Sequence, residues 1–186
     1  MVALTMAATT AQAAITLTVV ANAGSGLYTA ADGSSLTTGF MRYGTLDLAA
    51  FNALADNTDY AAVDALFTEL GTVNATPTGD FISIGNSFDI ANISGINAGD
   101  QLYSWVFNST SASTATEYGI FSSTIPTWDV APDLGTTTLS SATMNNTLVG
   151  TGFALASVGG VVPEPSTYAL FAGALALAFV AIRRRK

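Results

Sequence analysis

The chain contains no cysteine and no histidine among its 186 residues. Without cysteine, neither a disulfide nor a thiolate metal site can support the fold, and no cysteine nucleophile is available. Without histidine, the usual general base and the commonest neutral metal ligand are missing, which excludes a Ser-His-Asp triad. No serine lies in a G-x-S-x-G elbow either. We therefore expect a protein that is not an enzyme and that uses no cofactor and no metal ion.

Carboxylates are the remaining catalytic candidates, and they are poorly placed for catalysis. A glycosidase needs two positioned carboxylates, and only Glu69 and Glu117 are glutamates ahead of the C-terminal segment. Glu69 falls at the end of a predicted helix and Glu117 just before a predicted strand, so we expect both on the surface. The aspartates near turns are Asp32, Asp80, Asp100, Asp129 and Asp133. Their default role is turn formation, and calcium binding at one of them stays open.

Cations are almost absent from most of the chain. The sequence has 5 Lys and Arg against 13 Asp and Glu, for a net charge of −8. Four of the five cations are the last four residues, and the fifth is Arg42. Residues 14–162 consequently carry a net charge of about −11. Such a surface repels phosphate backbones, so nucleic-acid binding is excluded and cations or neutral polymers are the favoured neighbours.

The C-terminal 26 residues have three parts in a fixed order. Pro163, Glu164 and Pro165 come first and favour an extended backbone. Tyr168 to Ile182 follows without a charge and would span about 23 Å as a helix, against roughly 30 Å of hydrocarbon. The large apolar residues of this predicted membrane helix are Tyr168, Leu170, Phe171, Leu175, Leu177, Phe179, Val180 and Ile182.

Four cations, Arg183, Arg184, Arg185 and Lys186, end the segment. Their long side chains can reach the headgroups, and the positive-inside rule places this end in the cytoplasm. The alternative is a buried C-terminal helix of a soluble domain, and the clustered cations argue against it. We therefore predict a single transmembrane helix that anchors the protein in the inner membrane, with the rest of the chain outside.

This tail resembles the PEP-CTERM sorting signal of Gram-negative bacteria. The resemblance implies recognition by an exosortase, a membrane-embedded enzyme similar to a cysteine transpeptidase. It also implies export, cleavage by the exosortase, and delivery from the inner membrane to the cell surface or the extracellular polymer. Exosortase and exopolysaccharide are the partners that follow from it.

Residues 1–13 predict a signal peptide, because Ala11-Gln12-Ala13 is a small-x-small pattern typical of signal peptidase sites. A charged n-region is missing and the apolar stretch is short, which suggests a start further upstream. The competing interpretation is a first β-strand that begins near Met1.

Residues 14–160 predict a β-rich domain, a β-sandwich or jelly roll with two inserted helices. Short apolar runs separated by Gly, Asn and Asp indicate strands and turns. The run from Gln101 to Phe107 is apolar on both faces, which favours a central strand covered on both sides. The other predicted strands are Ala14 to Ala21, Phe81 to Ile84, Phe88 to Ile90, Tyr118 to Ser122, Thr136 to Leu139, Asn146 to Val149 and Gly152 to Ser157.

Helical spacing predicts two short helices, Leu46 to Ala55 and Asp59 to Leu70. Thr58 would cap the second helix and Gly71 would end it. An irregular surface excursion is the alternative. The segment from Gly99 to Gly150 also resembles the body of PEP-CTERM proteins of unassigned function, a much looser likeness than that of the tail.

The positions of two tryptophans help to distinguish the two functions that we consider. Trp105 is expected in the core, whereas Trp128 lies between Pro126 and Pro132 in a predicted loop and is the candidate glycan contact. We expect an exported, non-catalytic structural protein associated with exopolysaccharide. The alternative is a polysaccharide-binding, lectin-like module.

Overall fold

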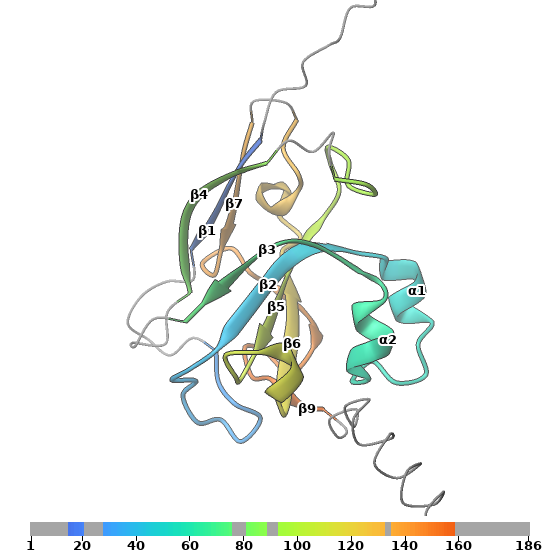
Figure 1. Ribbon diagram of the computed structural model, residues 1–186, viewed down its shortest axis with the longest axis vertical. Coiled ribbons are helices and arrows are strands. Elements are labelled where there is room, and N and C mark those ends of the chain that lie inside the picture. Colours follow the sequence, from blue (N-terminus) through green and yellow to red (C-terminus); the bar gives the residue numbers. More distant parts are fainter. Residues whose placement is uncertain (1–14, 21–27, 76–80, 89–92, 133–134, 159–186) are drawn as a thin grey trace, which may run out of the picture.

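The computed structural model describes residues 15–20, 28–75, 81–88, 93–132 and 135–158. The predicted signal peptide, 1–13, and the C-terminal segment, 161–186, lie outside the described residues. The described part is mainly β-structure with two short α-helices, as the sequence predicts (Figure 1).

The larger sheet holds six strands: β2 (Phe40–Leu46), β3 (Phe67–Asn74), β5 (Leu102–Phe107), β6 (Glu117–Ser122), β8 (Asn146–Val149) and β9 (Ala156–Ser157). Their order is β3-β2-β5-β6-β8, with β9 also paired to β6, and every pair is antiparallel. All six residues of β5 are buried. The prediction of a central strand covered on both faces is confirmed.

The smaller sheet has three strands in the order β4-β1-β7. The middle strand, β1 (Ile15–Val20), pairs antiparallel with β4 (Ile82–Phe88) and parallel with β7 (Thr136–Ser140). Leu139 of β7 packs in one core with Met41, Leu102 and Phe121 of the larger sheet. The two sheets therefore bury apolar side chains against each other, and one face of the larger sheet is closed in this way.

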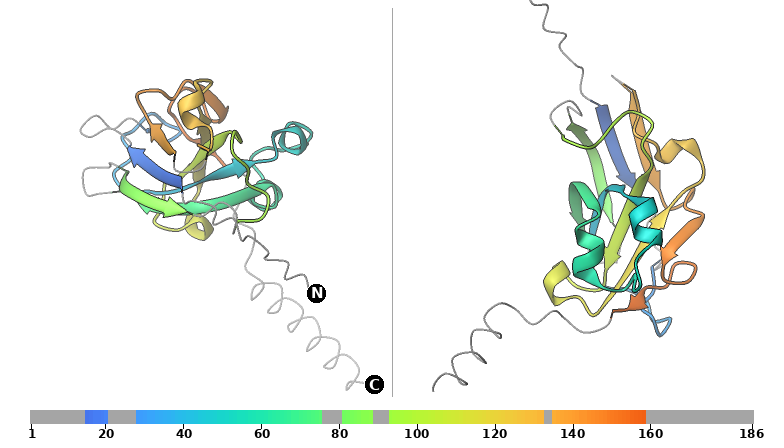
Figure 2. Two further views of the ribbon diagram at one scale, coloured as in Figure 1. Left: turned by 90° about the horizontal axis from the view of Figure 1, so that it is seen from above. Right: turned by 90° about the vertical axis from the view of Figure 1, so that its right-hand side faces the viewer.

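The two helices help to close the opposite face of the larger sheet. They are α1 (Leu48–Asn52) and α2 (Tyr60–Asp64), which lie beside each other in Figures 1 and 2. Phe51 of α1 and Val63 of α2 join a second core with Trp105 of β5. Each helix starts at an aspartate whose carboxylate accepts backbone N–H groups, which is the usual N-cap interaction.

The second predicted helix was too long. α2 ends at Asp64, and β3 begins at Phe67. Phe67 and Leu70 are three residues apart, which reads as helical spacing, but in a strand that spacing places them on opposite faces. Because each face has its own core, both side chains are buried.

The predicted boundaries of α2 were also wrong. Its cap is Asp59, whose Oδ1 accepts from the N–H groups of Ala61 and Ala62. Thr58 instead donates from its backbone N and its hydroxyl to Asp56. Gly71, the expected helix terminator, lies inside β3.

Three strand predictions need correction. A single strand, β4, runs through Gly85 and Asn86, where we expected a turn between two strands. The predicted strand Gly152 to Ser157 shrinks to the two residues of β9. β2 was not predicted, although it pairs with both β3 and β5.

The described residues contain no helix long and apolar enough to cross a membrane, and the predicted spanning segment 168–182 lies outside them.

Candidate functional site

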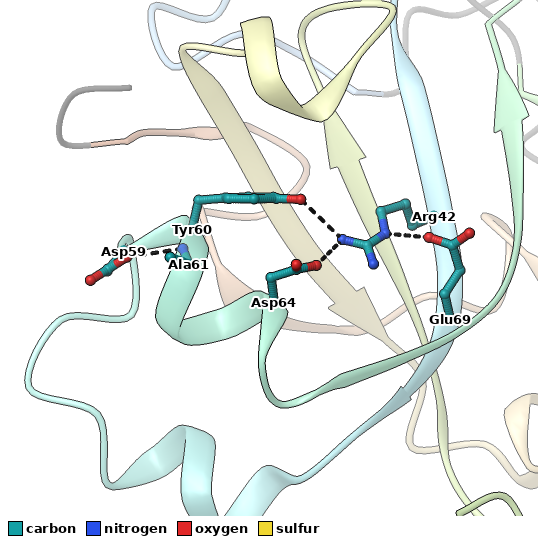
Figure 3. A network of polar contacts seen from close by, with 6 residues as sticks. All are labelled: Arg42, Asp59, Tyr60, Ala61, Asp64 and Glu69. Atoms are coloured by element: carbon teal, nitrogen blue, oxygen red, sulfur yellow. Dashed lines mark hydrogen bonds and ion pairs between the residues drawn. The ribbon is translucent and has the colours of Figure 1, made fainter. Parts of the chain in front are cut away.

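Arg42 is held in a polar network between β2, α2 and β3 (Figure 3). Its Nε donates to Glu69 Oε2 at 2.5 Å, and its Nη1 donates to Asp64 Oδ1. Nη1 also lies 3.4 Å from the Tyr60 hydroxyl oxygen. The guanidinium is thus paired with carboxylates on two separate elements, and only 12% of the side chain is exposed.

Opposing effects act on the pKa of Arg42. Burial is the largest single effect and lowers the pKa, whereas the hydrogen bonds and charges of Asp64 and Glu69 together raise it above its ordinary value. The guanidinium therefore stays charged and neutralised by its own neighbours. This arrangement ties α2 to the sheet, and the described residues therefore offer no open cation for an anionic ligand.

Trp128 is buried, with 1% of its surface exposed, so the prediction of an exposed loop tryptophan is wrong. It ends a 3₁₀ turn, η3 (Pro126–Trp128), that folds the indole into the core beside Leu139 and Met144. Its Nε1 donates to Thr143 Oγ1 at 2.9 Å. Within the described part, the large hydrophobic side chains left exposed are Leu48 and Ile125, neither of them aromatic.

Three further large aromatic residues are also in the core. Trp105, Tyr103 and Tyr118 are 0%, 4% and 1% exposed, which confirms the prediction of a core Trp105. The Tyr118 hydroxyl donates to the Asn57 carbonyl oxygen at 3.0 Å. None of these rings offers an open face on which a sugar could stack.

Of the aspartates predicted at turns, Asp32 and Asp100 form turns, whereas Asp129 lies in an isolated β-bridge with Gln101. Asp32 Oδ1 accepts from the Ser34 N–H, and hydrogen bonds to Ser34 lower the pKa of Asp32. Asp100 Oδ2 accepts from the Asn97 N–H at 2.6 Å. Asp80 and Asp133 lie outside the described residues. Across the described ranges, no group of three or more acidic side chains is placed to hold a metal ion.

A groove of about 510 Å³ lies at one end of the larger sheet. Its walls come from the segment that links β2 to α1, the segment before and at the start of β3, the loop before β5, and β5 itself. The polar side chains that line it include Thr45, Asp47, Thr68, Asn97, Asp100 and Gln101. Leu48 also lines it and is 42% exposed.

Structural hydrogen bonds fix several of these polar groups. Asp47 uses Oδ1 to accept from the Ala50 N–H at 3.0 Å. Asp100 uses Oδ2 for both the backbone and the side-chain N–H groups of Asn97. Gln101 Nε2 donates to the carbonyl oxygens of Leu102 and Trp128. In each of these two carboxylates, one oxygen therefore accepts hydrogen bonds from the protein, and the second oxygen can accept from a ligand.

Sequence reasoning missed this groove. Its walls are contributed by residues 45–48, 66–68 and 95–103, which come together only when β2, β3 and β5 pair. Among the groove residues, Asp47 carries a recognisable sequence signal, but an aspartate ahead of a helix indicates an N-cap and not a groove.

Residues 161–186 match the family described as the PEP-CTERM protein-sorting motif. The chain carries a PEP-CTERM sorting signal. The PEP-CTERM signal implies exosortase-dependent sorting of an exported protein, with the exosortase as partner. It contains every predicted sorting residue, namely Pro163, Glu164, Pro165 and the terminal cations. No curated protein and no solved structure matches the chain.

Proposed function

We propose that the body of this PEP-CTERM protein is a non-catalytic structural component of the cell surface or extracellular matrix, associated with exopolysaccharide. The observation that carries the proposal is the sorting motif at residues 161–186, which implies exosortase-dependent sorting of an exported protein.

The chemistry of the body supports a passive role. The sequence offers neither histidine nor cysteine for catalysis. Arg42 is neutralised by Asp64 and Glu69 within the fold. The remaining acidic groups give the body a net negative charge, which keeps it hydrated and free of anionic partners. A neutral hydrated polymer is compatible with such a surface.

The route is part of the same proposal. Residues 1–13 direct export, and the segment 168–182 holds the chain in the inner membrane with residues 183–186 in the cytoplasm. The exosortase then processes the chain near Pro163-Glu164-Pro165 and releases the body. The apolar length and the terminal cations support this orientation.

The sorting step is tested by reversing the terminal charge. Arg183, Arg184, Arg185 and Lys186 are all replaced by Glu in a host that has an exosortase, and the protein is followed by cell fractionation. We expect the variant to stay unprocessed, since orientation depends on these cations. The matched control replaces the three arginines by Lys, keeps the charge, and should be sorted normally. Normal surface delivery of the glutamate variant contradicts the proposal.

The matrix association is tested on cells that secrete the wild-type protein. The protein should co-purify with the extracellular polysaccharide and be released when that polymer is digested enzymatically. A protein that stays in the soluble medium, untouched by digestion, refutes the association.

A lectin-like function is the second candidate, and the groove beside Leu48 is the observation that favours it.

A further inference from the structure

The groove at the end of the larger sheet has the size of a small-ligand site and a mainly polar lining. Its volume of about 510 Å³ falls within the range of roughly 300–1,000 Å³ that is usual for such sites. We propose that it binds a neutral segment of a polysaccharide. This inference rests on the proposed association with exopolysaccharide and assigns it to one place on the molecule.

The lining matches the two surfaces of a sugar ring. A neutral sugar presents several hydroxyl groups at its edge and C–H groups on its faces. The carboxylates of Asp47 and Asp100 accept hydrogen bonds from hydroxyls, and the amide of Asn97 can both donate and accept. Leu48 supplies an apolar contact for the C–H groups. Leu48 and Ile125 are the large hydrophobic side chains left exposed in the described ranges, and of these two Leu48 lines the groove.

The acceptors are positioned before any ligand arrives. Asp47 is fixed by its bond to the Ala50 N–H, and Asp100 by its bonds to Asn97. When a ligand bonds to the second oxygen of each carboxylate, these side chains consequently lose little conformational entropy. Hydrogen bonds to charged acceptors are also the stronger kind.

Tyr103 adds a hydroxyl group to the lining. It lines the groove and is 4% exposed as a whole residue. Burial raises the pKa of Tyr103, so the hydroxyl keeps its proton at neutral pH and remains a donor. Such a donor can bond to a sugar hydroxyl or ring oxygen.

The charge of the lining selects a neutral ligand. Among the described residues, Asp47 and Asp100 are the charged side chains that line the groove, and neither Lys nor Arg is among them. An acidic polymer such as a polyuronate would be repelled. Two carboxylates without a third acidic group make a poor cage for calcium, which takes six to eight oxygen ligands.

The test is saturation-transfer difference NMR on the full chain in mild detergent. The probes are maltotetraose, cellotetraose and mannotetraose, with a galacturonate tetramer as the anionic comparison. At least one neutral tetrasaccharide should bind saturably and the galacturonate should not. Failure of all three neutral probes to bind overturns the inference.

Two pairs of variants locate the site. Asp47→Asn keeps an N-cap residue for α1 and removes the carboxylate, whereas Asp59→Asn makes the same change at the cap of α2, outside the groove. Leu48→Ala is matched by Ile125→Ala, the other exposed hydrophobic residue. We expect Asp47→Asn to weaken binding about tenfold, because a charged hydrogen bond is lost. Leu48→Ala should also weaken it, while Asp59→Asn and Ile125→Ala bind as the wild type does.

Equal affinities in all four variants would place binding elsewhere and refute the assignment.

Calcium chloride alone is titrated in parallel while amide NMR shifts are recorded. Shifts that Asp47→Asn abolishes would identify a cation site and also overturn the inference. If the groove variants bind normally while polymer digestion still releases the wild-type protein from the matrix, only this inference fails. If a tetrasaccharide binds the groove but the protein never co-purifies with the matrix, the proposed function fails instead.

Discussion

The guanidinium of Arg42 lies over the indole ring of Trp105, with 5.0 Å between the Cζ atom and the ring centroid. The two residues face each other across β2 and β5, and the same guanidinium lies 5.2 Å from the ring centroid of Phe67. Arg42 therefore covers the aromatic core on the helical side of the sheet while its donors reach Asp64 and Glu69. Its aliphatic stem and planar head act as packing groups as much as charges.

Arg42→Ala should lower the free energy of unfolding by about 2 kcal/mol, because the cation–π contacts and the packing over Trp105 are lost together. Arg42→Lys keeps the charge but not the planar head, and should lose less. Urea unfolding followed by tryptophan fluorescence measures both variants. A wild-type midpoint for Arg42→Ala would show that the network adds nothing to stability.

Trp128→Ala should lower the free energy of unfolding by about 3–5 kcal/mol, the usual range for removal of a large core side chain. Trp128→Phe should lose less, because the ring is kept and mainly the hydrogen bond to Thr143 is removed. Thermal unfolding followed by circular dichroism measures both variants. A Trp128→Ala protein as stable as the wild type would contradict the core position. Loss of polysaccharide binding in that variant would not by itself indicate a sugar contact, since unfolding explains it.

Stability should fall at alkaline pH because of buried tyrosines. Burial raises the pKa of Tyr28 to about 12, from an ordinary value of 10.0. The unfolded chain therefore loses this proton first, so the contribution of Tyr28 is complete below about pH 10. It decreases by about 1.4 kcal/mol per pH unit as the pH rises toward about 12. Burial also raises the pKa of Tyr118, which adds to the same trend.

Tyr28→Phe should make the alkaline part of the stability profile shallower. Urea titrations between pH 8 and about 12 test this. An unchanged slope in the variant would mean that Tyr28 does not titrate with unfolding.

Gly71→Ala should destabilise the fold more than Gly33→Ala. A Cβ atom at Gly71 would lie 2.4 Å from the hydroxyl oxygen of Tyr43, whose side chain is fully buried and cannot move aside. We expect a cost of about 2 kcal/mol or more from this overpacking. Gly33 has φ +83° with open space around it, so alanine there meets only backbone strain of about 1 kcal/mol. Equal midpoints in urea would contradict the close packing of β3 on Tyr43.

The sequence was informative where burial is simple. Gln101 to Phe107 is apolar on both faces, and β5 is buried on both faces. It gave a wrong prediction in β3, where Phe67 and Leu70 are buried in two different cores and their spacing imitates that of a helix. Trp128 was misplaced because flanking prolines suggest an exposed loop, whereas the 3₁₀ turn directs the indole inward. The groove could not be predicted, since strand pairing assembles its walls from distant segments.

The middle position of β1 in the smaller sheet has a consequence for export. β1 starts at Ile15, but its two neighbours are β4, which ends at Phe88, and β7, which ends at Ser140. During vectorial transfer from the N-terminus, β1 would emerge long before either neighbour. Loop closure over such separations is slow and entropically costly. The smaller sheet can therefore be completed only after β7, close to the end of the body, has also crossed.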